Sequence, residues 1–173
     1  DRGLPSLARA NGLPGDEVSR LFYMAEGPEG QAQTKETTLN TMIVDHSFLD
    51  LMEVNLTQGR HFSKDIRSDD TAAFIINEAA AKALGWKEPL GKQLEMGLGY
   101  NGRVIGVMKD FHYTSLHHKI EPLVLVVNLK TQGFLLARVS AKSLPATVNF
   151  IEQQWKAFDP KHPMEYFFLD ENF

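Results

Sequence analysis

Strand-like segments in this chain come in adjacent pairs, and helical segments stand between only some of those pairs. Two strong candidates, residues 123–129 and 134–140, are joined by a short turn that contains Gly133. The longest helical pattern follows them directly, and an alternating segment, residues 164–169, comes after that helix. Because a regular βαβ array would place a helix after every strand, this order predicts an α+β fold.

The longest helical pattern begins after Ser143, a good cap, and ends before Pro160. Its apolar residues recur at spacings of four and three, which places them on one face. They are Leu144, Val148, Ile151, Trp155 and Phe158. We expect this stripe and the aromatic residues 166–168 to belong to the core rather than to line a ligand pocket, because aromatics at regular periodicity usually pack inside.

The remaining elements follow from shorter signals. The pattern predicts strands at residues 19–25, 38–44, 72–76, 92–96 and 103–108, a short helix after Ser47 and a longer one at residues 78–84. Asn77 is placed to cap the longer helix, and Gly85 stands where the helix needs a left-handed residue to end. The first 40 residues are rich in Gly and Pro, so we expect loops there around one strand, with the polar residues 31–38 in a loop or turn.

Composition excludes several classes of protein. A net charge of -4 and a pI near 5.9 give no basic footprint for nucleic acid. The absence of cysteine excludes disulfides, thiolate metal sites and cysteine nucleophiles. The longest apolar runs are about five residues, whereas a membrane helix needs about 20. The chain also starts at Asp1 without a start signal, so we expect it to be a fragment of a larger protein.

Residues 97–102 match the dinucleotide-binding pattern G-x-G-x-x-G. That motif works only when it follows a strand and opens a helix, whose N-terminus holds the pyrophosphate. Here the next residues, 103–107, are strand-like, so we interpret the glycines as a hairpin turn. The chain has no G-K-[ST] phosphate loop and therefore shows no ATP site of its own.

A loop with three histidines is the strongest candidate for metal chemistry. Asp110, His112, His117 and His118 supply imidazoles and a carboxylate, but their spacing matches no established zinc pattern. We favour a polar loop. A hydrolytic pair of Ser115 with one of these histidines is less favoured still, because the chain has no G-x-S-x-G nucleophile elbow.

Asp65, Asp69 and Asp70 form an acidic loop together with Ser63 and Ser68. A calcium site would need more oxygen ligands at regular offsets and a glycine in the turn. We therefore expect a solvated loop. Taken together, these motifs predict no catalytic, cofactor-binding or metal-binding residue and no cofactor.

An ordered series of short segments carries a family resemblance. The segments are MIVDHSFL (42–49), GRHFS (59–63), IINEAAAK (75–82), LGW (84–86), PLGK (89–92), VIGVMKDFHY (104–113) and EP (121–122). The series resembles the MacB-like periplasmic core domain of bacterial ABC-transporter permeases, a branch of the FtsX-like superfamily. The closing residues 168–173 are similar to the stretch that such permeases carry shortly before a transmembrane helix.

The resemblance implies a position and an architecture. The domain would lie on the periplasmic side of the bacterial inner membrane, between two transmembrane helices of a permease. It would have two small lobes with mixed or antiparallel sheets and helices packed on one face. Residues 41–119 would form an inserted lobe, and residues 1–40 and 120–173 a discontinuous porter-like lobe.

The resemblance also implies a function without catalysis. The domain would couple ATP hydrolysis by a cytoplasmic ATPase subunit, through the membrane part of the permease, to export or envelope signalling. A periplasmic adaptor or a second permease copy are further candidate partners, and nucleic acid is not. Two rival hypotheses remain open: an extracytoplasmic sensor with an aromatic ligand pocket, and a metal-dependent enzyme that uses Asp110, His112, His117 and His118.

Overall fold

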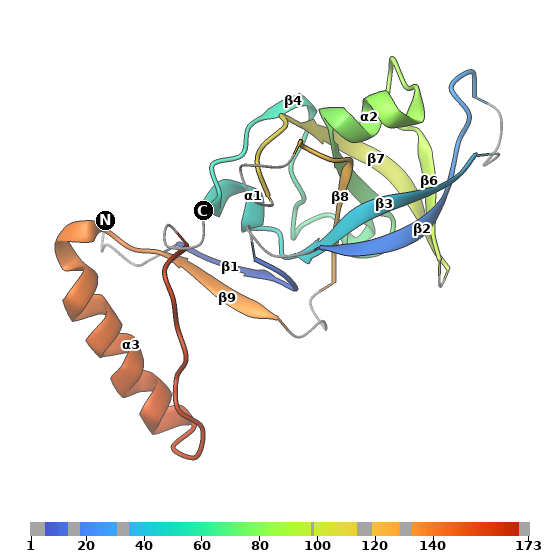
Figure 1. The fold of residues 1–173 in the computed structure, drawn as a ribbon. Helices are drawn as coiled ribbons and strands as arrows, with labels where there is room; N and C mark the ends of the chain where they lie inside the picture. The colour runs from blue at the N-terminus through green and yellow to red at the C-terminus, as the bar shows by residue number, and fades with distance from the viewer. Residues whose placement is uncertain are drawn as a thin grey trace.

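The computed structural model describes residues 6–13, 18–30, 35–97, 99–113, 119–128 and 133–169. Nine strands and three α-helices follow one another along these residues (Figure 1). In chain order they are β1 (Ser6–Ala10), β2 (Ser19–Ala25), β3 (Lys35–Val44), α1 (Phe48–Leu51), β4 (Leu56–Gly59), the 3-10 helix η1 (Arg67–Asp70), β5 (Ala73–Asn77), α2 (Glu78–Leu84), β6 (Gln93–Met96), β7 (Tyr100–Met108), β8 (Leu123–Val127), β9 (Phe134–Arg138), the 3-10 helix η2 (Ala141–Ser143) and α3 (Leu144–Phe158).

Six of the strands close into a barrel. Their order is β2-β6-β7-β5-β8-β3, and β2 pairs with β3 as well as with β6, so the ring is complete. The pairs β3–β8 and β5–β7 are parallel, and the other four pairs are antiparallel. This mixed sheet with few helices confirms the predicted α+β class. Closure leaves none of these six strands with a fully exposed edge.

The barrel interior is apolar, and all six strands contribute to it. The contributing side chains include Tyr23, Leu39, Phe74, Leu94, Val104 and Val124. Ala80 and Leu84 of α2 belong to the same buried cluster, so α2 covers one end of the barrel (Figure 1). The interior is therefore a packed core and not a channel.

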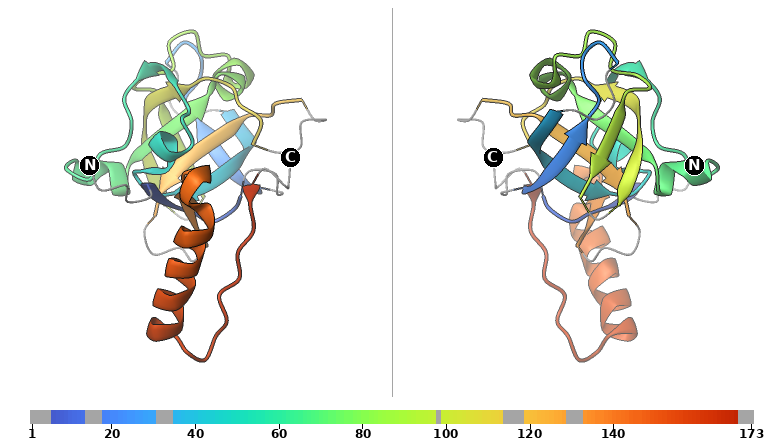
Figure 2. Two further views of the ribbon diagram at one scale, coloured as in Figure 1. Left: turned by 90° about the vertical axis from the view of Figure 1, so that its left-hand side faces the viewer. Right: turned by 90° about the vertical axis from the view of Figure 1, so that its right-hand side faces the viewer.

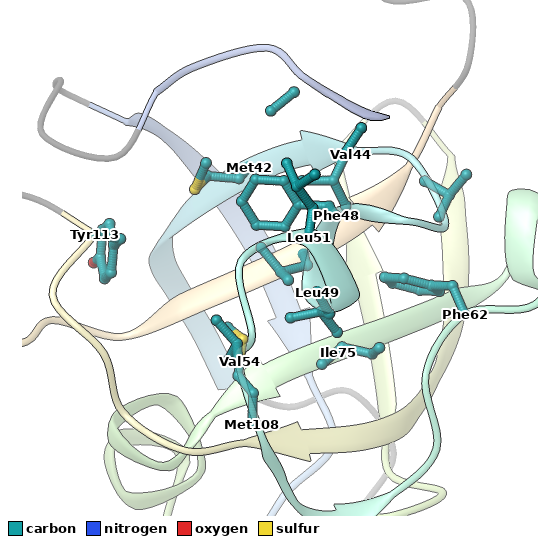
Figure 3. Packing of buried hydrophobic residues seen from close by; sticks show 14 of the residues in the cluster. Met42, Val44, Phe48, Leu49, Leu51, Val54, Phe62, Ile75, Met108 and Tyr113 are labelled. Atoms are coloured by element: carbon teal, nitrogen blue, oxygen red, sulfur yellow. The ribbon is translucent and has the colours of Figure 1, made fainter. Parts of the chain in front are cut away.

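A second core lies on the outer face of the barrel wall. Met42, Ile75 and Leu125 belong to a buried cluster separate from that of the interior, together with Phe48 of α1 and Phe62. Figure 3 shows the packing of this cluster. All five residues of β8 are buried, because alternate side chains enter the two cores. A continuous apolar run such as β8 is typical of a strand that is covered on both faces.

A two-stranded ribbon, β1 with β9, leaves the barrel on one side. The two strands pair over five residue pairs, and β1 reaches the barrel through the pair Ala10↔Val44. Two backbone hydrogen bonds support this joint, from Asn11 N to Ile43 O (2.9 Å) and from Asp45 N to Arg9 O (2.9 Å). The chain then enters α3, which projects away from the barrel (Figures 1 and 2). We call α3 and the returning residues 159–169 the arm.

The helices expected after Ser47, Asn77 and Ser143 are all present. The strand expected at residues 164–169 is wrong, because the segment runs back beside α3 and has no strand partner in the described part of the chain (Figure 1). Strands β1 and β4 were not predicted. β3 begins at Lys35, inside residues expected to form a loop or turn, because seven ladder pairs with β2 outweigh its polar sequence.

Candidate functional site

The loop after β7 does not assemble a metal site from the residues that the structure describes. Asp110 Oδ1 accepts a hydrogen bond from Ala79 N (3.0 Å), so this carboxylate caps the first turn of α2. His112 is exposed, and Ser115, His117 and His118 lie outside the described residues. Within the described ranges, no group of three His, Cys, Asp or Glu residues is placed to hold a metal ion.

The acidic loop is only partly solvated, so that expectation is wrong for Asp69. Its side chain is fully buried and accepts two hydrogen bonds from Arg60, at 2.6 and 2.9 Å, and one from Ser63 N at 2.9 Å. Burial acts to raise the pKa of Asp69, but the bonds from Arg60 and Ser63 outweigh it, and the pKa is lowered. Asp65 is exposed, as expected.

Asn77 joins three parts of the fold. Its Oδ1 accepts hydrogen bonds from Ala80 N (2.9 Å), which caps α2, and from Leu123 N (2.8 Å), which opens β8. Its Nδ2 donates to Glu121 O at 2.9 Å. The predicted helix cap is confirmed, and the same side chain also fixes the approach of residues 121–123 to the barrel.

A second hydrogen-bond network holds the segment before β8 against β3. Asn40 Nδ2 donates to Tyr113 Oη and to Glu121 Oε2, each at 2.8 Å, and Tyr113 Oη donates to Glu121 O at 3.2 Å. Burial raises the pKa of the Tyr113 hydroxyl. Asn77, Tyr113 and Glu121 come from the segments that carry the resemblance, so these motif residues hold the fold together.

The glycine-rich segment forms the turn between β6 and β7. Met96 pairs with Tyr100 across it, and Gly99 has a φ of +81°, which favours glycine. Gly102 lies against the backbone of Ala72, where an added Cβ would meet backbone atoms at 2.3 Å. The hairpin interpretation is confirmed, because strand β7 and not a helix follows the glycines.

A polar cleft opens between the loops that follow β2 and α2. Its lining includes Glu26, Lys92 and Arg103. Lys92 Nζ donates to Glu26 Oε1 at 2.7 Å, and this bond is the main reason why the pKa of Glu26 is lowered. Arg103 Nη1 donates to Gly91 O at 2.7 Å. These charged groups are therefore engaged with one another and with the backbone.

The arm is the region where the structure departs most from expectation. No residue of α3 is buried, and Phe158 and Phe150 are 84% and 60% exposed. Trp155 and Tyr166 are also exposed. The prediction that this stripe belongs to the core is wrong, although the stripe itself lies on a helix as predicted.

The arm nevertheless has an ordered tip. Trp155 Nε1 donates to His162 O at 2.8 Å, and the His162 ring lies 2.9 Å from Asp159 Oδ2. The Trp155 and Phe158 rings are 6.3 Å apart. The arm thus presents exposed aromatic side chains on a defined surface.

The likeness to known proteins agrees with this fold. The chain superposes on the periplasmic region of MacB from Actinobacillus actinomycetemcomitans with a TM-score of 0.70 and 17% identity, covering 99% of this chain and 75% of that one. It superposes on the extracellular domain of the noncanonic ABC-type transporter YknZ from Gram-positive bacteria with a TM-score of 0.66 and 16% identity, covering 94% and 80%. No curated protein matches the chain.

The family assignment is more direct than the structural likeness. The model of the MacB-like periplasmic core domain matches residues 3–152, which is most of the chain. The solved structures that this chain resembles are periplasmic or extracellular domains of membrane transporters. In the described part of the chain, no helix is long and apolar enough to cross a membrane. This chain belongs to the MacB-like periplasmic core domain family, the extracytoplasmic domain of ABC-transporter permeases.

Proposed function

We propose that this chain is a non-catalytic domain that couples ATP hydrolysis in the cytoplasm to export or envelope signalling through conformational change. The observation that carries the proposal is the family match over residues 3–152. The permease would place the domain on the periplasmic side of the bacterial inner membrane, and a cytoplasmic ATPase would drive it through the membrane part. A periplasmic adaptor or a second permease copy would receive the movement.

The construction of the domain suits a mechanical role. The closed barrel has two packed cores, and close-packed interiors transmit displacement instead of absorbing it. The arm is attached through the β1–β9 ribbon, with Ala10↔Val44 as the ladder pair at the barrel, and its returning end packs against the second core through Leu169. Because the barrel is close-packed, we expect any movement to occur where the ribbon and the arm meet it.

The division into an inserted lobe, residues 41–119, and a porter-like lobe, residues 1–40 and 120–173, remains part of this proposal. Strand pairing connects the two parts, because β8 pairs with β3 and β5, and β2 pairs with β3 and β6. We propose that the ribbon and the arm form the moving part of the porter-like lobe, while β2 and β8 move with the barrel.

Spin-label distances in the full-length permease with its ATPase test this function. The chain has no cysteine, so Gln153→Cys with Lys87→Cys would report the distance across the joint. We expect this distance to differ between the nucleotide-free and the ATP-trapped states. Lys64→Cys with Lys82→Cys, both exposed on the barrel side of the joint, is the control pair and should not change.

Two results would contradict the proposal. If the distance across the joint is the same in every nucleotide state, the domain does not undergo the movement that coupling requires. A movement that persists with an ATPase variant unable to bind nucleotide would show that ATP does not drive it. In both cases the barrel control pair shows whether the domain is folded.

A further inference from the structure

The turn that ends α1 holds a glutamate in a backbone conformation that favours glycine. Glu53 has a φ of +53°, and in the described part of the chain it is the only residue other than glycine with a positive φ. Two backbone hydrogen bonds fix the turn, from Glu53 N to Asp50 O (3.2 Å) and from Val54 N to Leu49 O (3.0 Å). Glycine or asparagine is preferred at such a helix end, because a Cβ atom is crowded there. The backbone alone therefore gives no reason for a glutamate at this position.

The side chain of Glu53 connects the barrel to the ribbon that carries the arm. Its Oε1 accepts a hydrogen bond from Arg138 Nη1, and the two charged groups form an ion pair. Arg138 is the last residue of β9, and the chain enters η2 and α3 soon after it. Strained residues that persist in a fold are often found where a contact serves a function. Here the strained residue is the one that reaches the root of the arm.

The ribbon is attached to the barrel at both of its ends. At one end, Ala10 of β1 pairs with Val44 of β3. Arg138 lies at the other end of the ribbon, where it pairs with Ser6, and four residues of a strand span about 13 Å. An attachment at this distance from the Ala10↔Val44 pair resists rotation of the ribbon about that pair.

Apolar contacts hold the middle of the ribbon against the barrel. Ala8 of β1 and Leu136 of β9 are buried in the second core together with Phe48 of α1, and Leu169 at the returning end of the arm packs against this core. Hydrophobic burial is non-directional, so these contacts keep the ribbon close without strictly fixing its angle. An ion pair with a defined donor and acceptor adds geometric specificity.

From this geometry we propose that the ion pair of Glu53 with Arg138 is a latch that sets the angle between the arm and the barrel. When the latch is closed, the ribbon is held at both ends. When it opens, the ribbon turns about the Ala10↔Val44 pair. The inference rests on the proposed function, because it names the contact that a movement at the joint has to break.

The exposure of the latch suits a contact that opens and closes. The side chains of Glu53 and Arg138 are 72% and 46% exposed. Ion pairs at such exposure contribute little to stability and are weakened by salt. The latch therefore biases the angle of the arm without locking it.

Spin-label distances in the 173-residue chain test the latch without nucleotide and without the membrane part. The labels are attached at Lys87→Cys on the barrel and at Gln153→Cys on α3, and we expect one main distance in the parent chain. Arg138→Met nearly keeps the length of the side chain and removes its charge. The fraction of molecules outside the main distance should then rise about two- to fivefold. Arg67→Met, which removes another exposed arginine on the barrel side, is the matched control and should leave the distribution unchanged.

Salt and a charge exchange separate the ion pair from other causes. Raising the ionic strength from about 0.01 M to 1 M should widen the distribution of the parent chain, because the charges are then screened, and Arg138→Met should no longer respond. Glu53→Arg places two cations next to each other and should displace the arm further. Combining Glu53→Arg with Arg138→Glu restores an ion pair and should restore the main distance.

Glu53→Asn separates the latch from stability. Asparagine is tolerated in the left-handed conformation, and its side chain is shorter and uncharged. The variant should therefore unfold in urea at the same or a higher concentration than the parent chain, while the fraction of molecules with a displaced arm rises. A residue that served stability alone would change both measurements in the same direction.

Three outcomes would overturn the proposal. A distance distribution that is unchanged in Arg138→Met and in Glu53→Asn would show that the pair does not set the angle. A displaced arm that the charge exchange does not restore, or that Arg67→Met also produces, would place the cause outside the pair. None of these outcomes affects the proposed function, which fails only if the distance in the full-length permease does not depend on ATP.

Discussion

The barrel and the arm carry similar apolar patterns and have opposite environments. Phe74 on β5 is completely buried and contacts the rings of Tyr23 and Tyr100, at centroid distances of 6.1 and 5.2 Å. Phe158 on α3 is 84% exposed although it lies on an equally regular apolar stripe. The comparison shows that periodicity identifies an apolar face but does not identify what covers it.

The difference has a topological origin. Each barrel strand is paired on both sides, and its side chains meet those of the other strands around the closed ring. The helix α3 follows the two-stranded β1–β9 ribbon, which lies outside the closed ring, and none of its residues is buried. The described residues of this chain therefore leave the stripe of α3 largely uncovered.

The largest effect is expected for Phe74→Ala. Removing a fully buried aromatic ring from the barrel interior should lower the free energy of unfolding by about 3–5 kcal/mol. Urea denaturation followed by circular dichroism would measure it. A loss below about 1 kcal/mol would mean that the interior is not packed as the structure shows.

A slightly smaller effect is expected for Asp69→Asn. The substitution leaves Arg60 without its buried partner and should cost about 2–3 kcal/mol at pH 7, less than for a fully buried pair because Arg60 is 43% exposed. Since the pKa of Asp69 is lowered in the folded state, its contribution exists above the unfolded pKa and is lost as the pH falls below about 4. Denaturation at pH 7 and pH 3 should therefore show a smaller difference between the variant and the parent chain at pH 3. An equal difference at both pH values would contradict this assignment.

The sequence predicted the parts of the fold that depend on local signals. Asn77 and Gly85 mark the ends of α2, and both occupy the expected cap positions. Closure of the barrel depends on pairing between β2 and β6, which are far apart in the chain, and no local pattern encodes it. The burial of Asp69 was missed for a different reason, since a charged loop gives no sign that Arg60 and Ser63 will satisfy one of its carboxylates.

An intermediate effect is expected for Asn77→Ala. The substitution removes the cap of α2 and leaves Leu123 N, at the start of β8, without its acceptor, for a loss of about 2 kcal/mol. Asn77→Asp is the comparison variant, because it keeps the accepting oxygen but places a buried carboxylate oxygen, which cannot donate, against Glu121 O. A loss for Asn77→Ala below about 0.5 kcal/mol, measured by urea denaturation, would show that the cap and the bond from Leu123 N contribute little.

The smallest effect on stability is expected for Phe158→Ser, and it completes the comparison with Phe74. Because the ring is mostly exposed, its removal should change the free energy of unfolding of the chain by less than about 0.5 kcal/mol. Binding of an apolar fluorescent dye to the folded chain should fall, because the substitution removes part of an exposed aromatic surface. A loss of stability close to that of Phe74→Ala would mean that α3 is packed in solution, and the contrast between barrel and arm would then disappear. If stability is unchanged in the chain but coupling fails in the full-length permease, the arm acts through contacts that only the assembled transporter provides.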